Sequence, residues 1–219
     1  MACAKDSGDK SQVLEIVLKS CIFVPMHEAI LDYIQNHAIT QLTNDQKEVI
    51  REVFIPRRYR KGQYLLQQGD VCKCMGFIVK GAMHQYALDD KGGEITISLP
   101  IENWFAGDRD SFYRETPSIY SVEAWEDCDL LLLPKVNLHR LLQIPAFIEM
   151  RIKLDENHTI ATQKRLLSQI GAGAEKRYED FLLAYPQLAN RFPQRMVASF
   201  LGITKETLSR IRRRVTCEK

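Results

Sequence analysis

The sequence contains no run of about eighteen consecutive apolar residues, which is the length that a membrane-spanning helix requires. Near the N-terminus the stretch VLEIVLKSCIFVP is interrupted by Glu15 and Lys19 and lacks a small-residue cleavage pattern, so no secretion signal is expected. The sequence also lacks a large excess of charge of either sign, because it contains 30 Lys and Arg residues and 28 Asp and Glu residues. We therefore expect a cytoplasmic protein that has no membrane partner and no overall attraction to polyanions.

Clustered cysteines are absent as well. The six cysteines are scattered, and a chain of 219 residues with 45% hydrophobic residues can form a core without disulfides. An iron–sulfur cluster needs closely spaced cysteines, whereas Cys3 and Cys21 lie far apart. Cys72 and Cys74 alternate on one predicted strand, with His84 as the nearest candidate partner. We interpret them as packing residues and keep metal or redox sensing as the alternative.

A spacing of nucleophile and base that would indicate an enzyme is also missing, so we assign no catalytic residue and no metal ligand. The charge that is present is distributed unevenly. Residues 191–219 contain eight basic and two acidic side chains, a net charge of +6, whereas the other 190 residues contain 22 basic and 26 acidic side chains, a net charge of −4. Such a basic end on a slightly acidic body is expected when only that end meets a polyanion.

The apolar pattern and the turn signals predict an α+β fold. Residues 11–42 have helical spacing, and Thr43 with Gln46 forms a capping-box signature for the next helix. Six short β-type segments between residues 59 and 133, separated by Gly-containing turns, predict a β-sandwich or roll. They are YLLQQ, MGFIVK, MHQYAL, ITISL, SIYSVEAW and CDLLLL. A long helix follows Pro145, and its mixed apolar stripe suits a dimer seam. The predicted domains are an N-terminal helical extension (1–42), a β-roll sensor (43–135), a linking dimerisation helix (136–170) and a C-terminal helical domain (171–219).

The segment QRMVASFLGITKETLSRIRRR has the pattern of a helix-turn-helix. Gly202 falls at the tight corner between two short helices, and Thr204 suits the N-cap of the second one. With Leu208 and Ile211 packed inward, the outward residues near the helix start can reach base edges in a DNA major groove. The alternative is a solvated, basic helix end. The predicted base-contacting residues are Lys205, Glu206, Ser209 and Arg210, and the predicted phosphate-contacting residues are Thr204, Thr207, Arg212, Arg213 and Arg214.

The end SFLGITKETLSRIRRR resembles the recognition end of the Crp/Fnr family of bacterial transcription regulators, in which a Glu and an Arg four residues later read bases. Upstream, RRYRKGQYLLQQGD and GFIVKGAMHQY resemble the first strands of that family's cyclic-nucleotide-binding β-roll, so the resemblance covers about residues 42–214. YEDFLLAYPQL and LGITKETLSRIRR are similar to a short-tailed branch known from Bacteroidetes, whose members end soon after the recognition helix. The resemblance implies a homodimer that binds near-palindromic double-stranded DNA, with RNA polymerase as a candidate further partner.

The resemblance also implies an effector pocket in the β-roll. The family holds the cyclic nucleotide with a Phe-Gly-Glu turn and an Arg-Ser-Ala or Arg-Thr-Ala segment. This sequence has Phe105, Gly107 and Asp108 at the first place, and Ser118 and Tyr120 at the second. Because the phosphate arginine is missing, and a buried phosphate without a cation is costly, we do not expect cyclic AMP to bind. An unidentified small-molecule effector, or none, is expected instead.

Two functions from different classes follow from these patterns. The first is a sequence-specific DNA-binding transcription regulator of Crp/Fnr type. The second is a ligand-binding or protein-interaction module of the cyclic-nucleotide-binding fold whose C-terminal helices have lost DNA binding. Steeply salt-dependent and sequence-selective binding to DNA separates the two, because neutralised phosphates release counterions.

Overall fold

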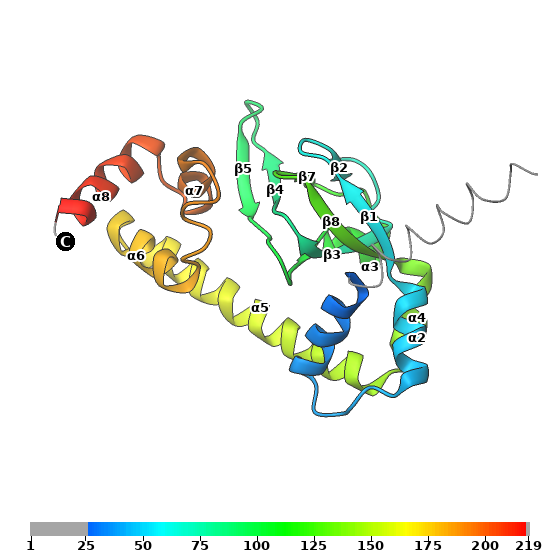
Figure 1. Cartoon of the computed structure of the whole chain (residues 1–219). Helices are drawn as coiled ribbons and strands as arrows, with labels where there is room; N and C mark the ends of the chain where they lie inside the picture. The colour runs from blue at the N-terminus through cyan, green and yellow to red at the C-terminus, as the bar shows by residue number, and fades with distance from the viewer. Residues whose placement is uncertain (1–25, 218–219) are drawn as a thin grey trace, which may run out of the picture.

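The computed structural model of the protein describes residues 26–217, with side chains described up to Arg214. Figure 1 shows a β-roll with small helices at one end, the long helix α5 leading away from it, and a group of helices at the far end of α5. We call the last group, residues 174–217, the head. Within the described residues, no helix is both long and apolar enough to cross a membrane.

Two four-stranded antiparallel sheets make the β-roll, one in the order β1-β8-β3-β6 and the other in the order β2-β7-β4-β5. Side chains from both sheets meet between them in one apolar cluster, where Ile78, Met83, Val122 and Leu130 are completely buried. The strands are β1 (Ile55–Tyr59), β2 (Tyr64–Leu66), β3 (Cys74–Lys80), β4 (Met83–Leu88), β5 (Glu94–Ser98), β6 (Phe105–Ala106), β7 (Ser121–Ala124) and β8 (Cys128–Pro134).

The sequence patterns located six of these strands but missed β1 and β6. The segment IPRRY of β1 contains Pro56 and two arginines, which argue against a strand on propensity alone. It forms nevertheless because β1 is the edge strand of its sheet, where a residue without an N–H is tolerated. The two-residue strand β6 is too short to produce a periodic signal.

A helical cluster closes one end of the roll. Residues 26–37 are helical, and Ile30 and Ile34 are fully buried against the roll and against the start of α5. The predicted helix is therefore confirmed for residues 26–37, whereas residues 11–25 lie outside the described residues. The predicted helix is too long at its other end, because residues 38–42 form a loop. There the Ile39 and Thr40 amides donate to the Glu149 carboxylate on α5 at 2.7 and 3.0 Å.

The capping box predicted for the next helix is present. The Thr43 hydroxyl accepts from the Gln46 amide and the Gln46 side chain accepts from the Thr43 amide at the start of α2 (Asn44–Val53). The other helices near the roll are α3 (Arg109–Arg114), the 3-10 turn η1 (Lys135–Asn137) and α4 (Leu138–Leu141).

The long helix α5 spans Pro145–Gly171, as the pattern after Pro145 predicts. Its buried side chains are Ala146, Phe147 and Met150, all in its first two turns. Most of the helix therefore projects from the roll with its sides exposed, which gives it room to contact a further partner.

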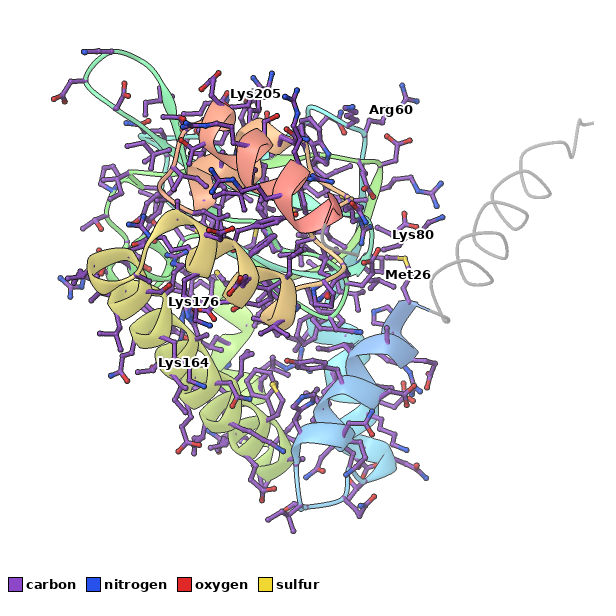
Figure 2. The ribbon with its side chains drawn as sticks, turned by 90° about the vertical axis from the view of Figure 1, so that its left-hand side faces the viewer. Met26, Arg60, Lys80, Lys164, Lys176 and Lys205 are labelled. Atoms are coloured by element: carbon purple, nitrogen blue, oxygen red, sulfur yellow. The ribbon has the colours of Figure 1, made fainter. Side chains whose placement is uncertain are left out.

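The head consists of α6 (Ala174–Ala184), α7 (Gln194–Phe200) and α8 (Lys205–Cys217) around its own aromatic and aliphatic core. That core continues into the β-roll, because Ala82, Leu99 and Ile101 belong to the same buried cluster as Tyr178 and Phe181. The head therefore rests on the roll as well as on α5. Figure 2, turned so that the left-hand side of Figure 1 faces the viewer, shows the head lying across the roll with Lys205 at the start of α8.

Candidate nucleic-acid interface and effector pocket

The corner between α7 and α8 depends on Gly202. Its φ of +65° lies in the left-handed region, which glycine adopts without the steric cost that a Cβ would bring. The Ile203 amide then donates to the carbonyl of Ala198 at 3.0 Å, which closes the turn. Arg177 on α6 also donates from Nη1 to the carbonyls of Leu201 and Gly202, at 3.2 and 3.4 Å. The sequence pattern placed Gly202 correctly but gave no sign that Arg177 supports the turn.

The start of α8 is capped as predicted. The Thr207 amide donates to the Thr204 hydroxyl at 3.2 Å, and the Leu208 amide donates to the Thr204 carbonyl at 3.0 Å. Glu206 lies in the first turn, where a carboxylate is stabilised by the helix dipole. Arg210 donates from Nη2 to the Thr207 hydroxyl at 3.3 Å, so its guanidinium lies along the outer surface of the helix.

The two faces of α8 differ strongly. Leu208 and Ile211 are buried in the head core. On the other side the predicted base-contacting residues lie together at the surface, with Lys205, Glu206 and Arg210 exposed and Ser209 half-buried. Of the predicted phosphate-contacting residues, Thr204, Arg213 and Arg214 are exposed and Thr207 and Arg212 are half-buried. Both sets are therefore accessible from solvent, at least in part, while the apolar face of α8 holds the helix in the head core.

In the β-roll, Asp108 and Ser118 are bonded to each other. The Ser118 hydroxyl donates to Asp108 Oδ2 at 2.7 Å, and both residues are buried. The other carboxylate oxygen, Oδ1, accepts from the amides of Asp110 and Ser111 at 2.9 and 3.3 Å and so caps α3. Both oxygens of Asp108 are thus used inside the protein, which limits its capacity to bind an effector.

Three further candidate pocket residues surround this pair or pack behind it. Gly107 has a φ of +140°, and a Cβ there would meet the Met75 sulfur at 2.7 Å. The Tyr120 amide donates to the Ser118 hydroxyl at 3.0 Å. Phe105 instead packs on Phe77, with ring centroids 5.2 Å apart, and contributes to the core. The structure therefore gathers Gly107, Asp108, Ser118 and Tyr120, and gives Phe105 a packing role.

Comparison with known families bears on the β-roll directly. The sequence model of the cyclic nucleotide-binding domain matches residues 56–144, which include all eight strands except the first residue of β1. The β-roll of this chain is therefore similar in sequence to that domain. No curated protein sequence matches the chain at a significant level.

Solved structures with a similar fold cover about three-quarters of the chain, more than the residues that this domain model matches. FixK2 from Bradyrhizobium japonicum is 19% identical, with a TM-score of 0.65 over 76% of this chain and 86% of that one. CLP, a c-di-GMP-responsive global regulator from Xanthomonas campestris, is 14% identical, with a TM-score of 0.62 over 78% and 90%. CooA from Carboxydothermus hydrogenoformans is 17% identical, with a TM-score of 0.61 over 76% and 78%. The chain therefore shares its fold with these structures over about three-quarters of its length.

Within the β-roll, the interpretation of Cys72 and Cys74 as residues that alternate on one strand is wrong. Val71 forms an isolated bridge to Pro117, and β3 begins only at Cys74, so Cys72 lies before the strand. Its thiol donates to the Cys74 carbonyl at 3.3 Å, and burial raises the pKa of Cys72 to about 11, which keeps it protonated. Within residues 26–217, no three His, Cys, Asp or Glu side chains are grouped so as to hold a metal ion.

His84 is not a partner of these cysteines either. Its neighbour Met83 points into the core between the sheets, so His84 lies on the opposite face of β4. It is completely buried, and its Nε2 bonds the Thr96 hydroxyl at 3.0 Å. Burial, with a contribution from the positive charge of Arg195, lowers the pKa of His84 to about 4. His84 is therefore a neutral packing residue beneath the head.

An ion-pair cluster that the sequence did not indicate joins the head to the β-roll. Arg191 lies in the head, between α6 and α7, and donates to the carboxylates of Glu102 and Glu126, which belong to the roll. Its guanidinium holds the pKa of Glu102 down at about 2. Glu102 and Glu126 are 24 residues apart in the sequence, and Arg191 is at least 65 residues from either of them. No local sequence pattern could therefore reveal the cluster.

Proposed function

We propose that this protein is a homodimeric, sequence-specific DNA-binding transcription regulator that reads DNA with α8. The observation that carries the proposal is the division of α8 into a buried apolar face and an exposed face that bears Glu206 and Arg210. The Gly202 corner and the Thr204 cap support it, because they fix the start of α8 relative to α7. The common fold with Crp/Fnr regulators agrees with it.

The exposed side chains suit base recognition. A guanidinium such as that of Arg210 can donate to both O6 and N7 of guanine, and the Glu206 carboxylate can accept from N4 of cytosine, each worth about 1–3 kcal/mol of discrimination. Thr204 and the exposed Arg213 and Arg214 would contact phosphates, which sets the register on DNA without reading sequence. The net charge of +6 over residues 191–219 supplies the electrostatic attraction.

Two heads are needed to read two half-sites. The exposed length of α5 offers the surface on which two copies would pair, and each head would then enter a major groove about 34 Å from the other. A near-palindromic site follows from this two-fold arrangement. Such a regulator acts in the cytoplasm, where RNA polymerase is a candidate further partner.

The cyclic nucleotide-binding domain would serve as the sensor or scaffold. Because Asp108 and Ser118 satisfy each other, and no arginine stands at the phosphate position, the effector would be a compound other than cyclic AMP. An effector would act by shifting the heads relative to the roll, a coupling on the order of 1–3 kcal/mol.

Selection from a random pool of double-stranded DNA tests the proposal. The expected result is an enriched near-palindromic sequence whose affinity for the protein falls steeply with salt concentration, since several phosphates are neutralised. Selection at low salt that enriches no sequence, with or without cell extract, would exclude a DNA-binding regulator. It would favour the other function, a ligand-binding or interaction module with an inactive head.

A further inference from the structure

A groove of about 910 Å³ lies between the C-terminal half of α5 and α6. On the α5 side it is lined by Ile160 and Leu167, and on the α6 side by Leu183. These side chains are large and aliphatic, yet Leu167 is 73% exposed and Leu183 is 81% exposed. Exposed apolar surface of this kind marks an interaction site.

The groove is continuous with an apolar stripe along α5. At about 100° per residue, the exposed aliphatic residues of α5 all fall within about 120° of the helix circumference. Ile160 and Leu167 belong to both the stripe and the groove, so a partner that covers the stripe also meets α6. The stripe consists of Ile148, Ile152, Ile160, Leu166, Leu167 and Ile170.

We infer that the groove receives α5 of a second copy of this chain, so that α6 of the head forms part of the homodimer interface. This inference rests on the proposed function, which requires two paired heads. The stripe from Ile148 to Ile170 is about 33 Å long, too long for a short peptide to cover, whereas α5 is about 40 Å long and carries a matching stripe. In a two-fold arrangement each copy covers the stripe and groove of the other.

The position of Leu183 has a direct mechanical consequence in this arrangement. Leu183 belongs to α6 and hence to the head, whereas the helix that it would contact is α5 of the second copy. Dimerisation then fixes each head against the opposite long helix as well as against its own roll. The distance between the two copies of α8 is therefore set partly by this contact.

Sedimentation measurements of the dimer dissociation constant test the inference with the full chain. Leu183→Asp is expected to weaken dimerisation at least tenfold, because a carboxylate would be buried in an apolar contact. Leu167→Asp, in both stripe and groove, is expected to leave a monomer. The matched control is Val136→Asp on η1. The Val136 side chain is 77% exposed, much like Leu167 and Leu183, but it lies outside both the stripe and the groove. This variant is expected to dimerise like the wild type.

If Leu183→Asp dimerises normally while Leu167→Asp is a monomer, α6 does not belong to the dimer interface. Pairing of two copies through α5, as the proposed function requires, would still hold. A wild-type protein that stays monomeric at micromolar concentrations would overturn both. Leu183→Ala adds no charge and is expected to weaken the dimer in the same direction but less, so it decides the question if the Asp variant does not fold. Weakening by Val136→Asp equal to that by Leu183→Asp would also refute the inference.

Discussion

Glu206 and Arg213 lie on the same exposed surface of α8, but we expect them to contact different parts of DNA. Glu206→Ala removes a base contact and is expected to relax base preference by about 1–3 kcal/mol at one position of each half-site. Arg213→Ala removes a phosphate contact and is expected to weaken binding to all sequences alike and to reduce the salt slope by about one. Binding to a panel of single-base variants of the selected site measures both effects.

A uniform loss of affinity for Glu206→Ala, without any change in base preference, would contradict the placement of the recognition face. Lys91→Ala, in the turn between β4 and β5, provides a control for the loss of one surface charge outside the head. It is expected to leave both preference and affinity close to those of the wild type.

The bond between Ser118 and Asp108 leads to a prediction about cyclic AMP. Because both carboxylate oxygens of Asp108 already accept hydrogen bonds inside the protein and the sequence has no arginine at the phosphate position, titration of the protein with cyclic AMP is expected to release no binding heat. Isothermal calorimetry measures this directly. Saturable, tight binding would show that a cation from elsewhere in the chain replaces the missing arginine.

For single residues, the sequence predicted those contacts that join residues close together in the chain. Thr204 and Gly202 act through residues within four positions, so the pattern sufficed for them. Arg177 and Arg191 act on residues more than twenty positions away, and no sequence spacing indicates such contacts.

The turn between α7 and α8 provides a test at the level of elements. Gly202→Ala is expected to destabilise the protein by about 1 kcal/mol, because a φ of +65° is strained for any residue with a Cβ, although the added methyl would make only ordinary contacts, with Arg177 Nη1 at 3.6 Å. Gly171→Ala, at the last residue of α5, adds a methyl in open space and at an ordinary φ, and is expected to be neutral or slightly stabilising. Urea denaturation of the two variants compares them.

Equal stability of the two variants would show that the corner tolerates an ordinary backbone conformation. The position of α8 would then rest on its core contacts and on Arg177 alone.

Most elements could be predicted from the sequence because their residues alternate or repeat within one segment. The strand β4 matches the segment MHQYAL at both ends, and α5 begins at Pro145 as expected. The strand β1 was missed because its place at a sheet edge, which tolerates Pro56, is a property of the whole sheet. The end of the first helix at residue 37 was missed because the loop after it is held by Glu149, more than a hundred residues away.

At the scale of the whole molecule, Arg191 joins the head to the β-roll. Arg191→Met is expected to destabilise the protein by about 1–2 kcal/mol at pH 7, because Glu102 and Glu126 lose a shared partner while remaining partly screened by water. Arg60→Met, at an exposed position on the roll, is the control and is expected to change stability little. Denaturant midpoints of the two variants and the wild type measure the difference.

The same cluster should make stability depend on pH. Because Arg191 lowers the pKa of Glu102 in the folded protein to about 2, its stabilising effect is complete above the ordinary carboxyl pKa of 4.5 and is lost as the pH falls towards 2. The difference in stability between wild type and Arg191→Met is therefore expected to shrink between pH 5 and about 2.5. A constant difference over that interval would show that the ion pair contributes little.

The contact between the head and β5 has another consequence. β5 is the outermost strand of its sheet, and on its open side the Ser199 hydroxyl of α7 accepts from the Thr96 amide at 2.9 Å, while Arg165 donates to the Ile97 carbonyl at 2.8 Å. Unpaired edges of this kind recruit strands from other molecules and promote aggregation. Movement of the head away from the roll would therefore expose the edge of β5 and promote aggregation. The need to stay soluble favours the arrangement in which the head covers this edge.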